Sequence, residues 1–194
     1  MGKRQEAALE TKKKIIEATK NLLSQKSIED INIEDITTKA KIAKGSFYTH
    51  FKRKEDVISV IALAEYEKAK MTALKDMSDV YEQISYYLIE SAKIIQRNTL
   101  ELAQQWIKSV SAPLEGENAG QIKYQFDRQN IIEFLHRLDN APIDIMADMI
   151  MDNYYGAVTT WCINKGEERS LVESIEHYCQ YGLKVLISFY QKED

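Results

Sequence analysis

Apolar residues recur with helical spacing in the first third of the chain. Within residues 10–27 they form one stripe, made of Ile15, Ile16, Ala18, Leu22 and Leu23. This spacing predicts an amphipathic helix that ends near residue 27. A second stripe follows Asn32, which has Asp35 three residues later and is therefore the predicted N-cap of a helix to about residue 40. In residues 44–51, two phenylalanines lie four residues apart and predict a third, short helix.

Two short helices joined by a turn of a few residues, and packed on a longer first helix, form a helix-turn-helix. The second helix of this motif lies in the major groove of DNA, and residues near its N-terminal end meet the base edges. Residues 1–54 are therefore predicted to be a helix-turn-helix DNA-binding domain.

The rest of the chain, residues 55–194, predicts long helices separated by short breaks. The clearest break, residues 111–120, holds one of the two prolines and two of the seven glycines, which are residues that interrupt helices. Ser170 and Glu173 have the spacing of a capping box in front of the last helix. The expected helices cover residues 54–74, 78–97, 99–110, 121–138, 143–164 and 171–191. The chain is thus predicted to be all-α, with about nine helices in total and a larger helical second domain.

Charge is distributed unevenly between these two regions. Residues 1–54 contain 13 Lys or Arg and 7 Asp or Glu, whereas residues 55–194 contain 13 and 23. A basic N-terminal region followed by an acidic remainder indicates an N-terminal domain that binds a polyanion and a second domain that repels it. Solvated lysine-rich helices would produce the same imbalance, so charge alone leaves both interpretations open.

Several function classes find no support in the sequence. No apolar run approaches the ~18 residues of a membrane span, and no charged-then-apolar leader opens the chain. We therefore expect a cytoplasmic protein with no membrane partner. No phosphate-cradling glycine loop, metal motif or nucleophile elbow is present. The sequence predicts no catalytic residue, no metal site and no cofactor, and a protein that is not an enzyme.

Residues 39–56 place cations among small polar side chains. A recognition helix needs short polar side chains that can approach bases, and flanking cations that neutralise phosphates. Lys44 is long enough to reach the acceptors of guanine, and Thr49 can offer its methyl group to thymine. Ser46 is a third candidate for base-edge contact, and Gly45 permits a close approach of the helix start to the DNA backbone.

The order and spacing of these residues resemble a known family. The string "KGSFYTHF" at residues 44–51 is followed by "KE" at residues 54–55, and over about residues 10–60 the chain resembles the tetracycline-repressor (TetR) family of bacterial transcriptional regulators. The resemblance implies that Tyr48, His50 and Lys54 contact phosphates or bases. It also implies that the rest of the chain is an all-helical domain for ligand binding and dimerisation. The candidate DNA-binding residues are Asn32, Lys44, Gly45, Ser46, Tyr48, Thr49, His50 and Lys54.

The turn between the two short helices departs from the family pattern. Where the family has a turn glycine, this chain has Lys41, and where the family has a serine cap for the recognition helix, it has Ala43. Lys41 is therefore expected to adopt a positive φ, a backbone conformation that residues with a Cβ tolerate less well than glycine.

Aromatic residues and methionines are frequent in the second region, and acids occur in the same helices. Tyrosine combines an apolar ring with a polar tip and methionine adapts its shape, which suits an apolar pocket with few polar groups. If some acids face inward, a cationic amphipathic ligand fits, since aromatic faces also attract cations. An ordinary core with solvated acids is the alternative. The candidate ligand-binding residues are Tyr87, Glu90, Trp106, Tyr124, Met149 and Tyr155.

The last two helices carry broad apolar faces, and each contains a glycine. An interior glycine costs about 1 kcal/mol against alanine, so the close approach of another helix is a reason to keep it. Two such helices from each of two subunits would form a four-helix interface, which the resemblance also implies; packing within one subunit is the alternative. The candidate interface residues are Gly156, Trp161, Tyr178, Gly182, Val185, Leu186 and Phe189.

Together these features predict a homodimeric transcriptional regulator, most readily a repressor, that binds a palindromic operator on double-stranded DNA. A twofold dimer presents two recognition helices ~34–36 Å apart, which matches such a site. A small-molecule effector would release the DNA, provided that it favours one conformation over another. A DNA-binding architectural or cell-division factor of the same fold, without an inducer, is the alternative. An enzyme or ligand carrier with an incidental basic head is disfavoured by the missing catalytic groups.

Overall fold

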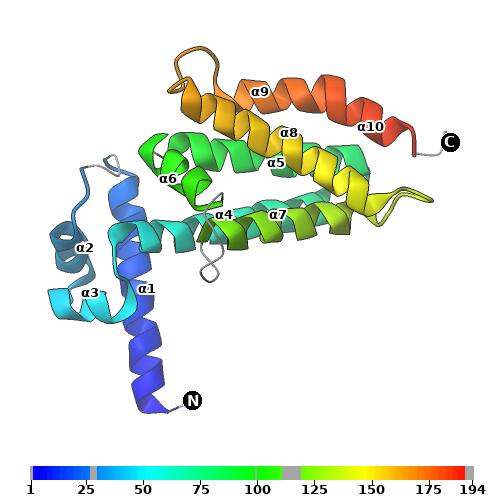
Figure 1. The fold of residues 1–194 in the computed structure, drawn as a ribbon. Coiled ribbons are helices and arrows are strands. Elements are labelled where there is room, and N and C mark those ends of the chain that lie inside the picture. Colours follow the sequence, from blue (N-terminus) through cyan, green and yellow to red (C-terminus); the bar gives the residue numbers. More distant parts are fainter. Residues whose placement is uncertain (1, 27–29, 99, 111–118, 191–194) are drawn as a thin grey trace. The chain divides into compact units, whose positions relative to one another are not determined.

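The structure of the protein is a computed structural model that describes residues 2–26, 30–98, 100–110 and 119–190. Within these residues the chain forms nine continuous helices and no strand (Figure 1), which confirms the predicted all-α class. None of the helices in this part of the chain is both long and apolar enough to cross a membrane. The chain divides into two compact units, Met1–Ala64 and Glu65–Asp194.

The N-terminal unit is built from α1 (Lys3–Leu23), α2 (Ile33–Ala40), α3 (Lys44–His50) and the first turns of α4 (Lys54–Asp76). Helix α1 packs against both α2 and α3. The apolar stripes meet in one small core, which contains Ile15, Ala18, Leu22, Ile31, Ile36, Ala40, Phe47, Phe51, Val57 and Ile61. The stripes predicted from the sequence therefore form the interior of a helix-turn-helix domain.

Local backbone features fix the two ends of α2. At its start, Asn32 Oδ1 accepts from the Asp35 amide at 2.9 Å, and Asp35 Oδ2 accepts from the Asn32 amide at 3.0 Å, which confirms the predicted cap. At its end, Lys41 has φ 55° and ψ 48°, so the expected positive φ is confirmed. This left-handed conformation costs a residue with a Cβ about 1–2 kcal/mol. The turn that leads into α3 is therefore held by the surrounding fold against a local preference.

The two units divide inside α4. The sequence places the domain boundary after residue 54, which is where α4 begins. In the structure the N-terminal unit extends to Ala64, because Val57 and Ile61 of α4 are buried in its core. Helix α4 runs as one continuous element from Lys54 to Asp76, so both units share it.

The C-terminal unit contains the rest of α4 and then α5 (Val80–Arg97), α6 (Leu100–Val110), α7 (Ala119–Leu135), α8 (Ile143–Ile163), α9 (Leu171–Tyr178), the π-helical η1 (Cys179–Leu183) and α10 (Lys184–Ser188). The elements α9, η1 and α10 follow one another without a break and form the single last helix that the sequence predicts. Ser170 Oγ accepts from the Glu173 amide at 3.0 Å, and Glu173 Oε2 accepts from the Ser170 amide at 3.3 Å. The predicted capping box is thus confirmed.

Four helices that pack on one another form most of the core of the C-terminal unit. Helix α5 packs against α7 and α9, and α8 packs against the same two helices (Figure 1). Tyr87, Phe134 and Tyr154 are among the largest fully buried side chains. Tyrosines carry hydroxyl groups into this interior, and buried polar groups need hydrogen-bond partners. For Tyr87 those partners are Asp127 and Asn130, which are themselves buried.

Candidate nucleic-acid interface

Helix α3 is anchored by one buried side chain, Phe47, which is fully enclosed by the N-terminal core. The other candidate residues of α3 reach the surface: Lys44, Gly45, Tyr48 and Thr49 are exposed, and Ser46 and His50 are half-buried. A Cβ built at Gly45 would meet no atom within 4 Å, so the packing of this chain does not require glycine there. The structure therefore brings these six residues together on one short helix that is open to a partner.

Two α3 side chains are held in place by contacts within the helix. Tyr48 is 51 % exposed and packs edge-on against Phe47, with ring centroids 5.6 Å apart. Its hydroxyl group is thus carried on an exposed ring that packs on Phe47, and tyrosine hydroxyl groups are among the donors that contact phosphates. Thr49 Oγ1 donates to the Gly45 carbonyl at 3.1 Å, which leaves its methyl group and oxygen lone pairs available.

Lys44, the first residue of α3, forms an ion pair that sequence reasoning missed. Its Nζ lies 2.8 Å from Glu34 Oε1 in the first turn of α2. The hydrogen bond from Lys44 lowers the pKa of Glu34, and the same bond raises the pKa of Lys44. Because both side chains are largely exposed, the pair contributes little to stability. Lys44 can therefore exchange Glu34 for a base or a phosphate at small cost.

Two candidate residues have structural hydrogen bonds of their own. Lys54 Nζ donates to the Ile31 carbonyl at 2.7 Å, which ties the start of α4 to the segment before α2. Asn32 uses its side chain in the cap of α2. Any contact of these residues with DNA must coexist with, or replace, these internal bonds. The sequence pattern identified both positions but gave no sign of their role in holding the domain together.

Further cations lie on the surface around α3. Lys39, Lys41, Lys52 and Arg53 are all exposed. Such side chains can neutralise phosphates without reading sequence. The N-terminal unit thus combines an exposed, short polar helix with flanking positive charge, which is the arrangement that major-groove readers use.

Comparison with known families agrees with this geometry. Residues 15–61 match the family described as bacterial regulatory proteins, tetR family. The matched segment covers the N-terminal core, from the buried stripe of α1 to the first turns of α4. Over this segment the chain is similar to the TetR family. The predicted resemblance, and with it a DNA-binding transcriptional regulator, is confirmed.

One relative and two solved structures are similar to this chain over most of its length, beyond the N-terminal unit. Over 162 residues the chain is 25 % identical to the HTH-type transcriptional repressor DhaR of Mycobacterium sp. (strain GP1), covering 70 % of this chain and 74 % of that protein. The fold resembles FadR of Thermus thermophilus, a TetR-family repressor solved with lauroyl-CoA, at TM-score 0.61 and 16 % identity over 94 % of this chain and 96 % of that one. FadR of Bacillus subtilis, solved with stearoyl-CoA, matches at TM-score 0.56 and 17 % identity, over 92 % of this chain and 98 % of that one.

Four of the six candidate ligand-binding residues gather in the C-terminal unit. The Tyr155 ring lies 5.3 Å from Trp106 and 5.1 Å from Tyr124. The hydroxyl groups of Tyr155 and Tyr87 both donate to one carboxylate. The other two candidates do not join this group. Glu90 forms an ion pair with Lys93 at 2.8 Å, and Met149 is 47 % exposed.

The shared carboxylate is Asp127 of α7, a residue that sequence reasoning missed. Its Oδ1 accepts from Tyr87 at 2.5 Å and its Oδ2 accepts from Tyr155 at 3.0 Å. Asp127 also forms an ion pair with Lys123 one turn earlier, and both side chains are at most 5 % exposed. Burial lowers the pKa of Lys123, and the charge of Asp127 acts in the opposite direction. A signal was present in the sequence, because residues 123 and 127 continue the buried face of α7 that includes Ile131.

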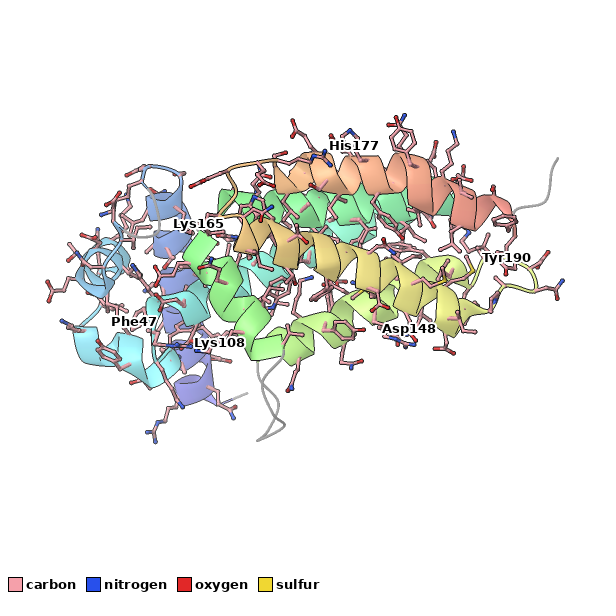
Figure 2. All side chains as sticks on the ribbon, turned by 45° about the horizontal axis from the view of Figure 1, so that its top comes forward. Phe47, Lys108, Asp148, Lys165, His177 and Tyr190 are labelled. Carbon is pink, nitrogen blue, oxygen red and sulfur yellow. The ribbon has the colours of Figure 1, made fainter. Side chains whose placement is uncertain are left out.

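The candidate interface residues divide between the surface and the core. Val185 is 52 % and Phe189 is 76 % exposed; Gly156 is exposed, whereas Tyr178, Gly182 and Leu186 are half-buried. Trp161 is only 9 % exposed and belongs to the core of its own subunit. Four further apolar residues of the last helices reach solvent, namely Ile145, Met149, Ile163 and Tyr181. His177 is exposed on α9, where Figure 2 shows side chains that project away from the bundle.

The two interior glycines have different surroundings. A Cβ at Gly182 would lie 2.9 Å from the Tyr178 ring, whereas a Cβ at Gly156 would meet nothing within 4 Å. Gly182 is therefore required by its own helix, at the π-helical turn η1. Gly156 leaves open space on α8 that a second helix could approach.

Proposed function

We propose that this TetR-family protein is a homodimeric, cytoplasmic repressor that binds a palindromic operator through α3 and releases it when a small molecule binds the C-terminal unit. The observation that carries the DNA-binding part is the arrangement of α3, in which one buried phenylalanine anchors a helix whose other side chains reach the surface. Flanking exposed lysines supply the phosphate contacts.

Dimerisation is supported by the apolar side chains that the last helices leave in solvent. Phe189, Val185 and Tyr181 are each more than half exposed and follow one another at four-residue spacing, so they share one side of the helix. Exposed apolar side chains at helical spacing favour burial against another helix. A second copy of the same face would cover them by twofold symmetry.

An effector site is supported by the aromatic residues around Tyr155. Rings from α6, α7 and α8 meet there, and half-buried Trp106 and Tyr124 connect the cluster to the surface. The two FadR relatives were solved with acyl-CoA molecules, which supports a ligand with an apolar part. The residue roles in all three sites are part of this proposal.

Selection of duplexes from a random pool tests the proposal first, and it should return an inverted repeat. Tyr48→Ala should then weaken binding to that site and to random DNA by about tenfold, because a hydrogen bond to a charged group is lost. Tyr48→Phe keeps the ring packed on Phe47 and isolates the hydroxyl group. Unchanged affinity of Tyr48→Ala in fluorescence anisotropy would contradict the proposal.

The oligomeric state is tested separately by light scattering. Phe189→Asp places a charge in the proposed interface and should produce monomers that no longer bind the inverted repeat with high affinity. Ser188→Asp adds the same charge to a neighbouring exposed polar position and is the matched control. A dimer that persists in Phe189→Asp would place the interface elsewhere.

A further inference from the structure

The buried ion pair of α7 has unequal partners around its two charges. Asp127 accepts hydrogen bonds from the Tyr87 and Tyr155 hydroxyl groups in addition to its ion pair with Lys123. Among the described residues, Lys123 has Asp127 as its only hydrogen-bond acceptor. Apart from this, its ammonium group lies over aromatic rings, with Nζ 3.7 Å from the centroid of Tyr66.

Because Asp127 has more hydrogen-bond partners than Lys123, the two charges differ in how easily each can lose the other and bind a ligand. If an added anion draws Lys123 away, Asp127 keeps two phenol donors, and hydrogen bonds to an ionised acceptor are strong. If an added cation takes Asp127 instead, Lys123 remains buried with ring faces alone, which is strongly unfavourable for an ammonium group. The cluster therefore accommodates an anion at Lys123 more easily than a cation at Asp127.

The acids that suggested a cationic ligand are engaged elsewhere or lie on the surface. Glu133 pairs with Lys70, and Asp148 pairs with Arg128. Asp152 is exposed. Asp127 is the buried acid next to the aromatic residues in the described part of this unit, and its charge is already neutralised by Lys123.

We infer that the C-terminal unit binds an effector with a monoanionic head group, such as a carboxylate, and an apolar body, and that Lys123 receives the anion. The inference rests on the proposed effector site and names the chemistry of its ligand. The apolar body would lie against Trp106 and Tyr124, whose half-buried rings pack with Tyr155 beside the ion pair. Apolar surface and one charged anchor together would give orientation and specificity.

The same contact offers a path to the DNA-binding unit. Tyr66, whose ring lies under Lys123, belongs to α4, the helix that both units share. An anion that moves Lys123 removes its cation–π contact with Tyr66, an interaction of real strength in a buried site. The bound ligand thereby acts on α4 and favours one state over another, as any effector must.

Isothermal titration of the full-length protein without DNA tests the head group. Octanoate, octanol and octylammonium share one apolar chain and differ in charge. We expect octanoate to bind at least about tenfold more tightly than either of the others. In Lys123→Met this preference should disappear, so that octanoate binds no better than octanol. Circular dichroism checks that the variant is folded, and the double variant Lys123→Met with Asp127→Asn provides a neutral cluster should the single variant unfold.

Several outcomes overturn the inference. If octanol or octylammonium binds the wild type as tightly as octanoate, the ligand head group is not recognised as an anion and the inference is wrong. The inference is also wrong if none of the three compounds binds at millimolar concentration. If the folded variants still bind octanoate more tightly than octanol, Lys123 is not the residue that receives the anion. Release of DNA is measured separately by anisotropy: octanoate that binds through Lys123 without changing DNA affinity would leave the anion site in place and refute effector-driven release.

Discussion

The two units of this protein use polar residues in opposite ways. In the N-terminal unit the described core holds apolar residues and two threonines but no charged side chain, and charged and hydroxyl side chains reach the surface on a short helix. In the C-terminal unit a lysine, an aspartate and two tyrosine hydroxyl groups are enclosed together inside the bundle. Surface charges serve a partner that arrives from solvent, whereas buried charges must satisfy each other until a ligand changes their pairing.

The energetic consequences differ just as much. The exposed Lys44–Glu34 pair can be broken at little cost, since water replaces either partner. The buried Lys123–Asp127 pair cannot be broken from one side without leaving a charge inside the protein. Substitutions in the first unit should therefore change binding more than folding, and substitutions in the second cluster should change folding first.

Asp127→Ala should have the largest effect on stability. It leaves the Lys123 ammonium group buried without its carboxylate, and breaking a buried pair from one side costs about 3–5 kcal/mol. The free energy of unfolding, measured by urea titration, should fall by that amount. Glu90→Ala removes an acid from the more exposed pair with Lys93 and should cost less than about 1 kcal/mol.

A double variant sharpens the same test. Lys123→Met combined with Asp127→Leu removes both charges, and replacing a buried pair with apolar residues is often neutral or stabilising. It should recover most of the stability that Asp127→Ala loses. If Asp127→Ala unfolds no more easily than Glu90→Ala, the contrast between the two units is wrong.

Lys44→Ala should change which DNA is bound more than how stably the protein folds. A lysine that reads guanine contributes about 1–3 kcal/mol of discrimination at one base pair. Site selection with the variant should therefore return a motif that is relaxed at one symmetric pair of positions. Lys39→Ala, an exposed lysine of α2, should weaken binding to all duplexes without changing the motif. Recovery of the wild-type motif with Lys44→Ala would show that Lys44 contacts only the backbone.

Sequence reasoning worked where the relevant residues are close together along the chain. The cap at Asn32 and Asp35, the positive φ at Lys41 and the capping box at Ser170 follow from local rules, and each is confirmed. The helix-turn-helix could be predicted for the same reason, since its pattern occupies consecutive residues. Local rules do not give tertiary partners, so the bonds of Lys44 to Glu34 and of Lys54 to the Ile31 carbonyl were missed.

The buried cluster could not be assembled from the sequence because its residues come from four helices. Tyr66, Tyr87, Asp127 and Tyr155 lie on α4, α5, α7 and α8, and each alone looks like an ordinary position of an amphipathic helix. Tyr87 and Tyr155 were selected by composition, but the charge that joins them was not. Only the packing of α7 shows that Lys123 and Asp127 point into the core instead of extending a solvated face.

Lys41→Gly should stabilise the N-terminal unit by about 1 kcal/mol, because glycine adopts the left-handed conformation at no steric cost. Lys39→Gly is the matched control: it makes the same exchange inside α2 and should destabilise by about 1 kcal/mol. Thermal unfolding of both variants shows whether each substitution raises or lowers the stability of the protein. A loss of stability in Lys41→Gly would mean that the lysine side chain, and not the backbone, holds the turn.

Glu34→Gln should have the smallest effect, and it acts on binding alone. The neutral amide no longer holds Lys44 by charge, so Lys44 becomes available to neutralise one more phosphate. Affinity for random duplex should rise a few-fold, consistent with the small free energy of an exposed pair, and the salt dependence should steepen by about one charge. Glu10→Gln removes the same charge from α1, where Lys14 lies at 4.0 Å, and should leave the salt dependence nearly unchanged. Equal effects of the two variants would mean that Glu34 acts only through net charge, and that Lys44 is as available to DNA with its partner as without it.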